Sequence, residues 1–138
     1  MNIYRSRYTK YQGTHAEAVA AARREYHAIQ KRTPRRAPYV RSQYFRKDKI
    51  FINTFWDHLK QKAPAERSAR IRFYHCALDL LRNTSIAPVI TKSQESDIEL
   101  CRFYGQTTDG IYFCVQVKSN IRNHRKDFMS VFSVRKPT

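Results

Sequence analysis

The chain has 138 residues and carries 27 Lys and Arg against 11 Asp and Glu, a formal net charge of +16. That length fits one core with an appended arm and excludes two full domains. Hydrophobic residues make up 41% of the chain, too many for a disordered basic tail. No apolar run approaches the ~20 residues that cross a bilayer. We therefore expect a folded cytoplasmic protein without membrane association, whose excess charge meets a polyanionic partner.

The first 47 residues are the most strongly charged part of the chain, with 12 basic and two acidic residues. They predict one helix that begins after Thr14, because Glu17 lies three residues further on, as in a capping box. Two prolines interrupt the basic stretch that follows, which indicates an extended linker. Residues 1–47 are thus expected to form a basic helix and linker arm, and residues 48–138 an α+β core.

Two helices are predicted at the start of this core. Apolar residues recur at helical spacing over residues 51–59, and Asp48 can cap the helix that they form. A second apolar stripe begins near Ile71 and continues to about Asn83. Pro64 lies between the two stripes, so the two helices are expected to form a hairpin.

Beyond the helices the hydrophobic period changes to two, which is typical of strands with one buried face. The alternation is clearest over residues 111–118. Residues 98–104 are expected to pair with this strand through a loop in which Gly110 takes a positive φ, and residues 128–134 form a third strand. Residues 89–91 could add a fourth. The predicted fold is α+β in the order ααβββ, a two-helix hairpin packed on an antiparallel sheet of three to four strands, preceded by an N-terminal helix and basic arm.

Four strings within this core carry a resemblance to a known family. They are KDKIFINTFWDHL, RIRFYHCALDLLRN, RFYGQTTDGIYFCVQVK and KDFMSVF. In this order they resemble the barnase, EndoU, colicin and RelE (BECR) superfamily of small metal-independent ribonucleases, particularly its phage and mobile-element branches, over roughly residues 46–134. The resemblance implies RNA cleavage by a toxin or effector, with the catalytic groups on the open face of the sheet.

RNA cleavage without a metal uses the ribose 2′-hydroxyl as the nucleophile on the adjacent phosphate. The protein must take one proton, give another and neutralise the phosphorane. The alternation puts Gln116 and Lys118 on the open face of the sheet, with Arg102 and Tyr104 at matching positions on the preceding strand. Ser130 lies on the open face of the next strand if that strand continues the same alternation. The apolar residues on both sides of Ser130 leave open which of them face the core. Arg102, Lys118 and Ser130 are candidate catalytic residues, and Tyr104 and Gln116 are candidate RNA-binding residues, although a solvated sheet face would carry similar side chains.

His58 is the candidate proton carrier, because it lies on a predicted helix and its ordinary pKa is close to neutral. A role in helix packing is the alternative for this histidine. No pair of histidines of the EndoU kind can be assigned, so a RelE-like mode that uses Lys, Arg and Tyr stays open. The scattered histidines and the three cysteines, which lack CxxC spacing, predict neither a metal nor another cofactor.

Aromatic rings alternate with cations in the first third of the chain, a pattern that suits single-stranded RNA. The further residues expected to contact RNA are Arg35, Arg36, Arg41, Arg122, Arg125 and Lys126. An acidic antitoxin or immunity protein could occupy the same surface, because its carboxylates would mimic phosphates. The leading hypothesis is therefore an endoribonuclease. The rival is a non-catalytic nucleic-acid-binding module of the same fold, and a scaffold protein comes third.

Overall fold

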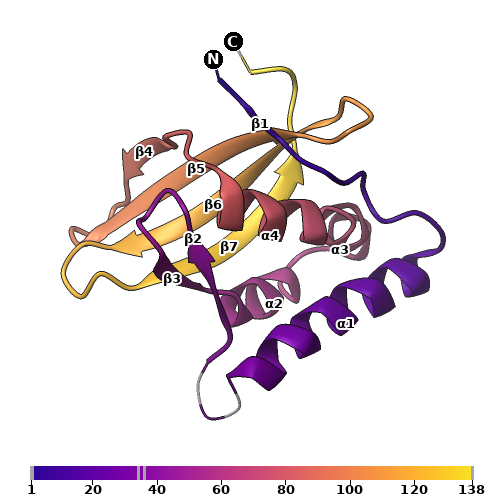
Figure 1. Ribbon diagram of the computed structural model, residues 1–138, viewed down its shortest axis with the longest axis horizontal. Coiled ribbons are helices and arrows are strands. Elements are labelled where there is room, and N and C mark those ends of the chain that lie inside the picture. Colours follow the sequence, from indigo (N-terminus) through magenta and orange to yellow (C-terminus); the bar gives the residue numbers. More distant parts are fainter. Residues whose placement is uncertain (1, 34, 36, 138) are drawn as a thin grey trace.

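A computed structural model describes residues 2–33, 35 and 37–137, which form one mixed, curled sheet covered by helices (Figure 1). In chain order the elements are β1 (Tyr4–Arg5), α1 (His15–Arg32), β2 (Tyr39–Ser42), β3 (Asp48–Phe51), α2 (Asn53–Leu59), α3 (Pro64–Ile71), α4 (Tyr74–Asn83), β4 (Val89–Lys92), β5 (Ile98–Gln106), β6 (Tyr112–Asn120) and β7 (Lys126–Ser133). No helix in these residues has the length and apolar character needed to cross a membrane.

The long strands β5, β6 and β7 form the middle of the sheet. The strand order is β1-β5-β6-β7-β3-β2, and β4 pairs with β5 beside β1. The pairs β1–β5 and β3–β7 are parallel, and the other neighbours are antiparallel. Figure 1 shows α1 as the outermost layer, with α2, α3 and α4 between it and the sheet.

The predicted architecture, a two-helix hairpin on an antiparallel sheet of three to four strands, is wrong. The described residues form four helices and a seven-stranded mixed sheet. Part of the difference comes from the segment expected to be an arm and linker, because β2 pairs with β3 and buries Val40 and Ile50 in the core. Asp48, expected to cap a helix, opens β3 instead, and its carboxylate lies 2.8 Å from the Lys126 Nζ.

The helix expected from near Ile71 to about Asn83 is confirmed at its end, but it does not include Ile71. α3 ends at Ile71 and α4 begins at Tyr74. The carbonyl of Arg72 accepts a hydrogen bond from the Tyr11 N–H at 2.9 Å, and the Arg72 guanidinium donates to the Tyr11 carbonyl at 3.0 Å. The N-terminal segment thus satisfies backbone groups that the break in the helix leaves free.

The helix α1 packs on the core. Its capping box is confirmed: Thr14 and Glu17 each accept a hydrogen bond from the other's backbone N–H at 3.1 Å. Ala18, Ala22 and Ile29 are buried and belong to the same apolar cluster as the sheet residues. The first third of the chain therefore contributes to the core as well as to the charge.

A bulge in β7 decides which of its residues face the helices. Val117 pairs with Phe128 and Gln116 with Ser130, so Met129 has no partner on β6. This extra residue shifts the alternation, and Phe128 and Val131 both join the core. The sequence left open which residues of this strand face the core. The bulge decides this, and it places Ser130 on the outer face beside Gln116.

Candidate functional site

The sheet has an inner face under the helices and an outer face turned away from them. On β5 and β6, Phe103, Val115 and Val117 are buried in the core. Because side chains alternate along a strand, Arg102 and Gln116 lie on the outer face, where both are half-buried. The outer face is the surface on which the sequence predicted catalytic groups.

Arg102, Gln116 and Ser130 are consecutive partners across β5, β6 and β7. Ser130 is only 5% exposed, because the guanidinium of Arg70 covers it and donates a hydrogen bond to its Oγ. Arg70 projects from α3, which contacts β7, and its guanidinium lies 5.2 Å from the centre of the Phe132 ring. One polar row therefore has an arginine at each end.

Lys118 lies in the adjacent row of the outer face. It pairs in register with Leu100 on β5 and with Asp127 on β7. The Asp127 carboxylate accepts a hydrogen bond from the Thr54 hydroxyl at 3.0 Å and lies 3.2 Å from the Arg125 Nε. Lys118 itself makes no ion pair with another described residue, so its charge is available to a ligand.

His58 lies on α2 one turn beyond Thr54, so both side chains occupy the same face of this helix. Thr54 contacts Asp127, which directs this face toward β7. Burial lowers the pKa of His58 below its ordinary value of 6.5, and the positive charges of Lys62 and Arg70 lower it further. His58 is therefore a neutral imidazole at pH 7 that can accept a proton.

Tyr104 lies next to the polar row, two residues after Arg102 on β5. It pairs in register with Cys114, which pairs in turn with Phe132 on β7. Burial raises the pKa of the Tyr104 phenol, with a further contribution from Cys114. The phenol stays protonated at neutral pH and can donate a hydrogen bond or a proton.

Aromatic rings and cations alternate at the β2–β3 end of the outer face. The rings of Tyr39 and Phe51 are cross-strand partners with centres 6.1 Å apart. Lys49 and Arg41 lie 4.8 and 5.4 Å from the centre of the Tyr39 ring, and the Arg125 guanidinium lies 4.2 Å from that of Phe51. These five residues, which we call the aromatic–cation patch, are continuous with Asp127, because Phe51 pairs with it.

The other predicted RNA-binding residues have different surroundings. Arg122 lies in the turn after β6, 83% exposed and 3.9 Å from Asp97. Arg35 is exposed beyond α1, and Arg36 lies outside the described residues. Lys126 is nearly buried against Asp48 and the Phe45 ring, on the inner side of β7, because it pairs with the inward-facing Ser119. Lys126 is therefore not part of the outer face.

Sequence reasoning missed Arg70, Thr54 and Asp127 as neighbours of the predicted site. No spacing in the sequence connects Arg70 with Ser130, because the two residues lie 60 positions apart. The KDF string contains Asp127, but its partners come from α2 and from the turn before β7. Among the described residues, no group of three or more His, Cys, Asp or Glu side chains is arranged to hold a metal ion.

Comparisons with known proteins give no match for this chain. No family model matches it, and neither does a curated protein or a solved structure.

Proposed function

We propose that the chain is a metal-independent endoribonuclease that binds and cleaves RNA on the outer face of its sheet. The observation that carries this proposal is the row of Arg102, Gln116 and Ser130, with the Arg70 guanidinium bonded to Ser130. Two arginines and the unpaired Lys118 beside one polar row suit a scissile phosphate, because negative charge builds up there in the transition state. The resemblance to the BECR superfamily points to the same reaction, carried out by a toxin or effector in the cytoplasm.

In the proposed reaction, neutral His58 takes the proton of the ribose 2′-hydroxyl. The 2′ oxygen then attacks the adjacent phosphorus, the O2′–P bond forms and the P–O5′ bond breaks. Arg102 and Lys118 stabilise the phosphorane, and Tyr104 gives its proton to the leaving 5′ oxygen. The products carry a 2′,3′-cyclic phosphate and a 5′-hydroxyl. If His58 only packs against β7, the RelE-like alternative assigns the proton transfers to Lys, Arg and Tyr.

The aromatic–cation patch is the proposed path of the RNA strand beyond the cleavage row. Bases stack on aromatic rings whatever their sequence, and the cations beside the rings meet the phosphates. The patch and the cleavage row share the outer face, since Phe51 pairs with Asp127 and Asp127 with Lys118. An acidic antitoxin or immunity protein would inhibit the enzyme by covering this same face, because its carboxylates would replace the phosphates.

The test is cleavage of a structured RNA by the full chain in the presence of a chelator. We expect products that end in 2′,3′-cyclic phosphate, and no cleavage of a matched substrate with 2′-deoxyribose at the cut positions, because that substrate lacks the nucleophile. The Arg102→Ala variant controls for contaminating nucleases. Intact RNA across several substrates, or cleavage of the deoxy substrate, would reject the proposed reaction.

A second candidate function is RNA binding without cleavage. The aromatic–cation patch favours it, because its rings and cations can bind a strand whether or not His58 and Tyr104 move protons. The two functions separate in one experiment. A binding module retains salt-dependent affinity for single-stranded RNA while leaving the RNA intact, whereas the enzyme produces cyclic phosphate ends.

A further inference from the structure

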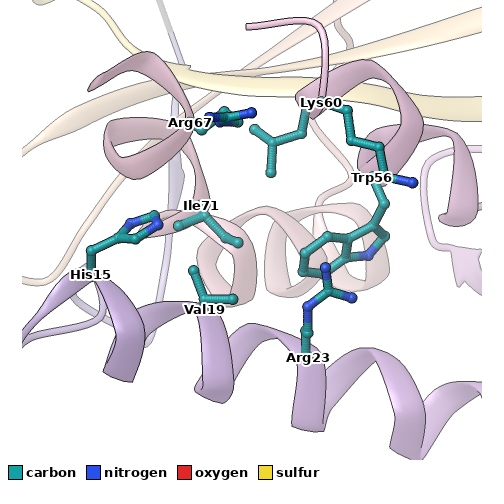
Figure 2. Close-up of a pocket in the computed structure, with 8 residues that line it drawn as sticks. His15, Val19, Arg23, Trp56, Lys60, Arg67 and Ile71 are labelled. Atoms are coloured by element: carbon teal, nitrogen blue, oxygen red, sulfur yellow. The ribbon is translucent and has the colours of Figure 1, made fainter. Parts of the chain in front are cut away.

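The helical layer contains a cavity on the opposite side from the outer sheet face. It has a volume of about 230 Å³ and lies between α1, α2 and α3 (Figure 2). Its apolar lining consists of Val19, Trp56, Leu59 and Ile71, and its polar lining of His15, Arg23, Lys60 and Arg67. The candidate RNA site uses a different face of α2, because His58 lies near Thr54 whereas Trp56 and Lys60 point to the other side of the helix.

The polar lining of this cavity is cationic. Among the described residues, Arg23, Lys60 and Arg67 form neither an ion pair nor a side-chain hydrogen bond, in contrast to Arg7, Arg70, Arg122 and Arg125, which lie within 4.0 Å of acidic groups. The guanidinium of Arg23 lies 4.7 Å from the centre of the Trp56 ring. An apolar floor surrounded by three unpaired cations favours an occupant that is apolar in the middle and acidic at its margins.

The size and lining of the cavity favour a protein side chain over a nucleobase. Cavities that hold whole drug-sized ligands measure roughly 300–1,000 Å³, so this one suits a single large side chain. Its floor is mostly aliphatic, Arg23 covers one face of Trp56, and the Tyr26 ring packs against the indole at 5.6 Å. Trp56 is also only 9% exposed, so little of its ring is left for a base to stack on.

The shape of the walls favours a helix as the occupant. His15, Val19 and Arg23 follow one another at four-residue spacing along α1, so this wall is about 12 Å long. Lys60 and Arg67 lie across the cavity from it, as Figure 2 shows. A groove with two cationic walls accepts a helix that inserts one apolar side chain and places carboxylates on both sides of it.

We propose that this cavity is the docking site for an acidic amphipathic helix of a partner protein. One apolar side chain of the partner fills the space above Val19 and Ile71, and flanking Glu or Asp residues pair with Arg23, Lys60 and Arg67. Docking of this kind is independent of the ribonuclease activity, because it uses neither the outer sheet face nor His58.

The test uses a synthetic helical peptide of about 16 residues, long enough to form several helical turns, with one central Phe flanked by Glu at helical spacing. It is titrated into the full chain labelled with ¹³C in its methyl groups. We expect saturable shifts of the Val19, Leu59 and Ile71 methyl signals. Replacing the central Phe of the peptide by Ala should weaken binding by about tenfold or more, the usual contribution of one buried anchor side chain.

Two protein variants make the test specific. Arg67→Glu should weaken binding of the peptide at least tenfold, whereas Arg24→Glu, a matched charge reversal on α1 outside the cavity lining, should leave the affinity unchanged. Val19→Phe places a larger side chain in the cavity and should abolish the shifts of the Leu59 and Ile71 methyl signals. Absence of shifts with the unmodified chain, or equal affinity of Arg67→Glu and Arg24→Glu, would overturn the proposal. It would also fail if a single-stranded RNA shifted the same methyl signals more strongly than the peptide.

Discussion

Arg70 donates a hydrogen bond to Ser130, although the two residues lie 60 positions apart in the chain, one on α3 and one on β7. The Arg70 side chain is 19% exposed and also contacts Glu66 at 3.9 Å. Ser130 is the partner of Gln116, which is the partner of Arg102. Arg102 is the one guanidinium that the sheet itself contributes to this row. The contact between Arg70 and Ser130 adds a second guanidinium from α3.

Arg70→Ala should lower the rate of RNA cleavage by about 10²-fold, the effect of losing one donor to the charge of the transition state. The free energy of unfolding should fall by only about 1 kcal/mol, because water can reach the Ser130 hydroxyl once Arg70 is removed. Single-turnover cleavage and chemical denaturation measure the two effects. Arg67→Ala is the matched control on the same helix, and equal cleavage rates for the two variants would exclude Arg70 from the site.

The sequence predicted correctly those features whose signal lies within a few neighbouring residues. The capping box of Thr14 and Glu17 is formed, and Gly110 takes a φ of 92° in the loop between β5 and β6. The alternation over residues 111–118 corresponds to β6, with Phe113, Val115 and Val117 buried. These features depend on residues a few positions apart, so one stretch of sequence carries the whole signal.

The contacts that sequence reasoning missed connect distant segments. Residues 48–51 form a strand because they pair with β2 and, at Phe51, with Asp127 of β7. The helical spacing of apolar residues over 51–59 gave no sign of these partners. The bulge at Met129 adds one residue to β7 and has no local signature. For the same reason the row of Arg102 and Gln116 could be anticipated from alternation, whereas Arg70 could not.

Arg102→Ala and Lys118→Ala should each lower the cleavage rate by about 10²-fold or more while the melting temperature barely changes, because both side chains lie on the outer face. Lys92→Ala, which removes an exposed lysine from β4, is the matched control. Rates and thermal melts are measured on the same preparations. If both variants cleave at the parent rate, the outer face is not the active site.

The pH dependence of cleavage tests the role of His58. As a general base it acts when deprotonated, so the rate should fall on the acidic side, with a midpoint below 6.5 because burial and the charges of Lys62 and Arg70 lower its pKa. His58→Asn should lower the rate and remove this acidic limb from the pH–rate profile. A profile that keeps the same limb in His58→Asn would show that another group carries the proton.

Lys62→Ala gives a second measurement of the same pKa. Removing this positive charge should raise the pKa of His58 toward 6.5, so the acidic limb should move to higher pH. Lys60→Ala is the matched control, because Lys60 lines the cavity on the other side of α2. If the acidic limb moved equally in both variants, the change would reflect the overall charge of the protein and not the proximity of Lys62 to His58.

The aromatic–cation patch should determine the salt dependence of RNA binding. Arg41→Ala and Lys49→Ala should each make the plot of log K against log salt less steep by ~0.7, the value for one phosphate contact on a single strand. Titrations at several salt concentrations measure the slope, and Arg24→Ala on α1 is the control. An unchanged slope in both patch variants would place the strand elsewhere.

Gly105→Ala should destabilise the protein, because Gly105 lies on the inner side of β5 opposite Phe113. An added Cβ would lie 2.5 Å from the Phe113 Cζ and 3.0 Å from the Leu80 Cδ1, closer than packed carbon atoms allow. The free energy of unfolding should fall by about 1–3 kcal/mol, the usual cost of overpacking a core. Phe113→Leu removes the ring carbons in question, so Gly105→Ala should cost less in that background. Chemical denaturation of the four proteins gives the coupling between the two positions, and strict additivity would show that Gly105 is required for a reason other than its contact with Phe113.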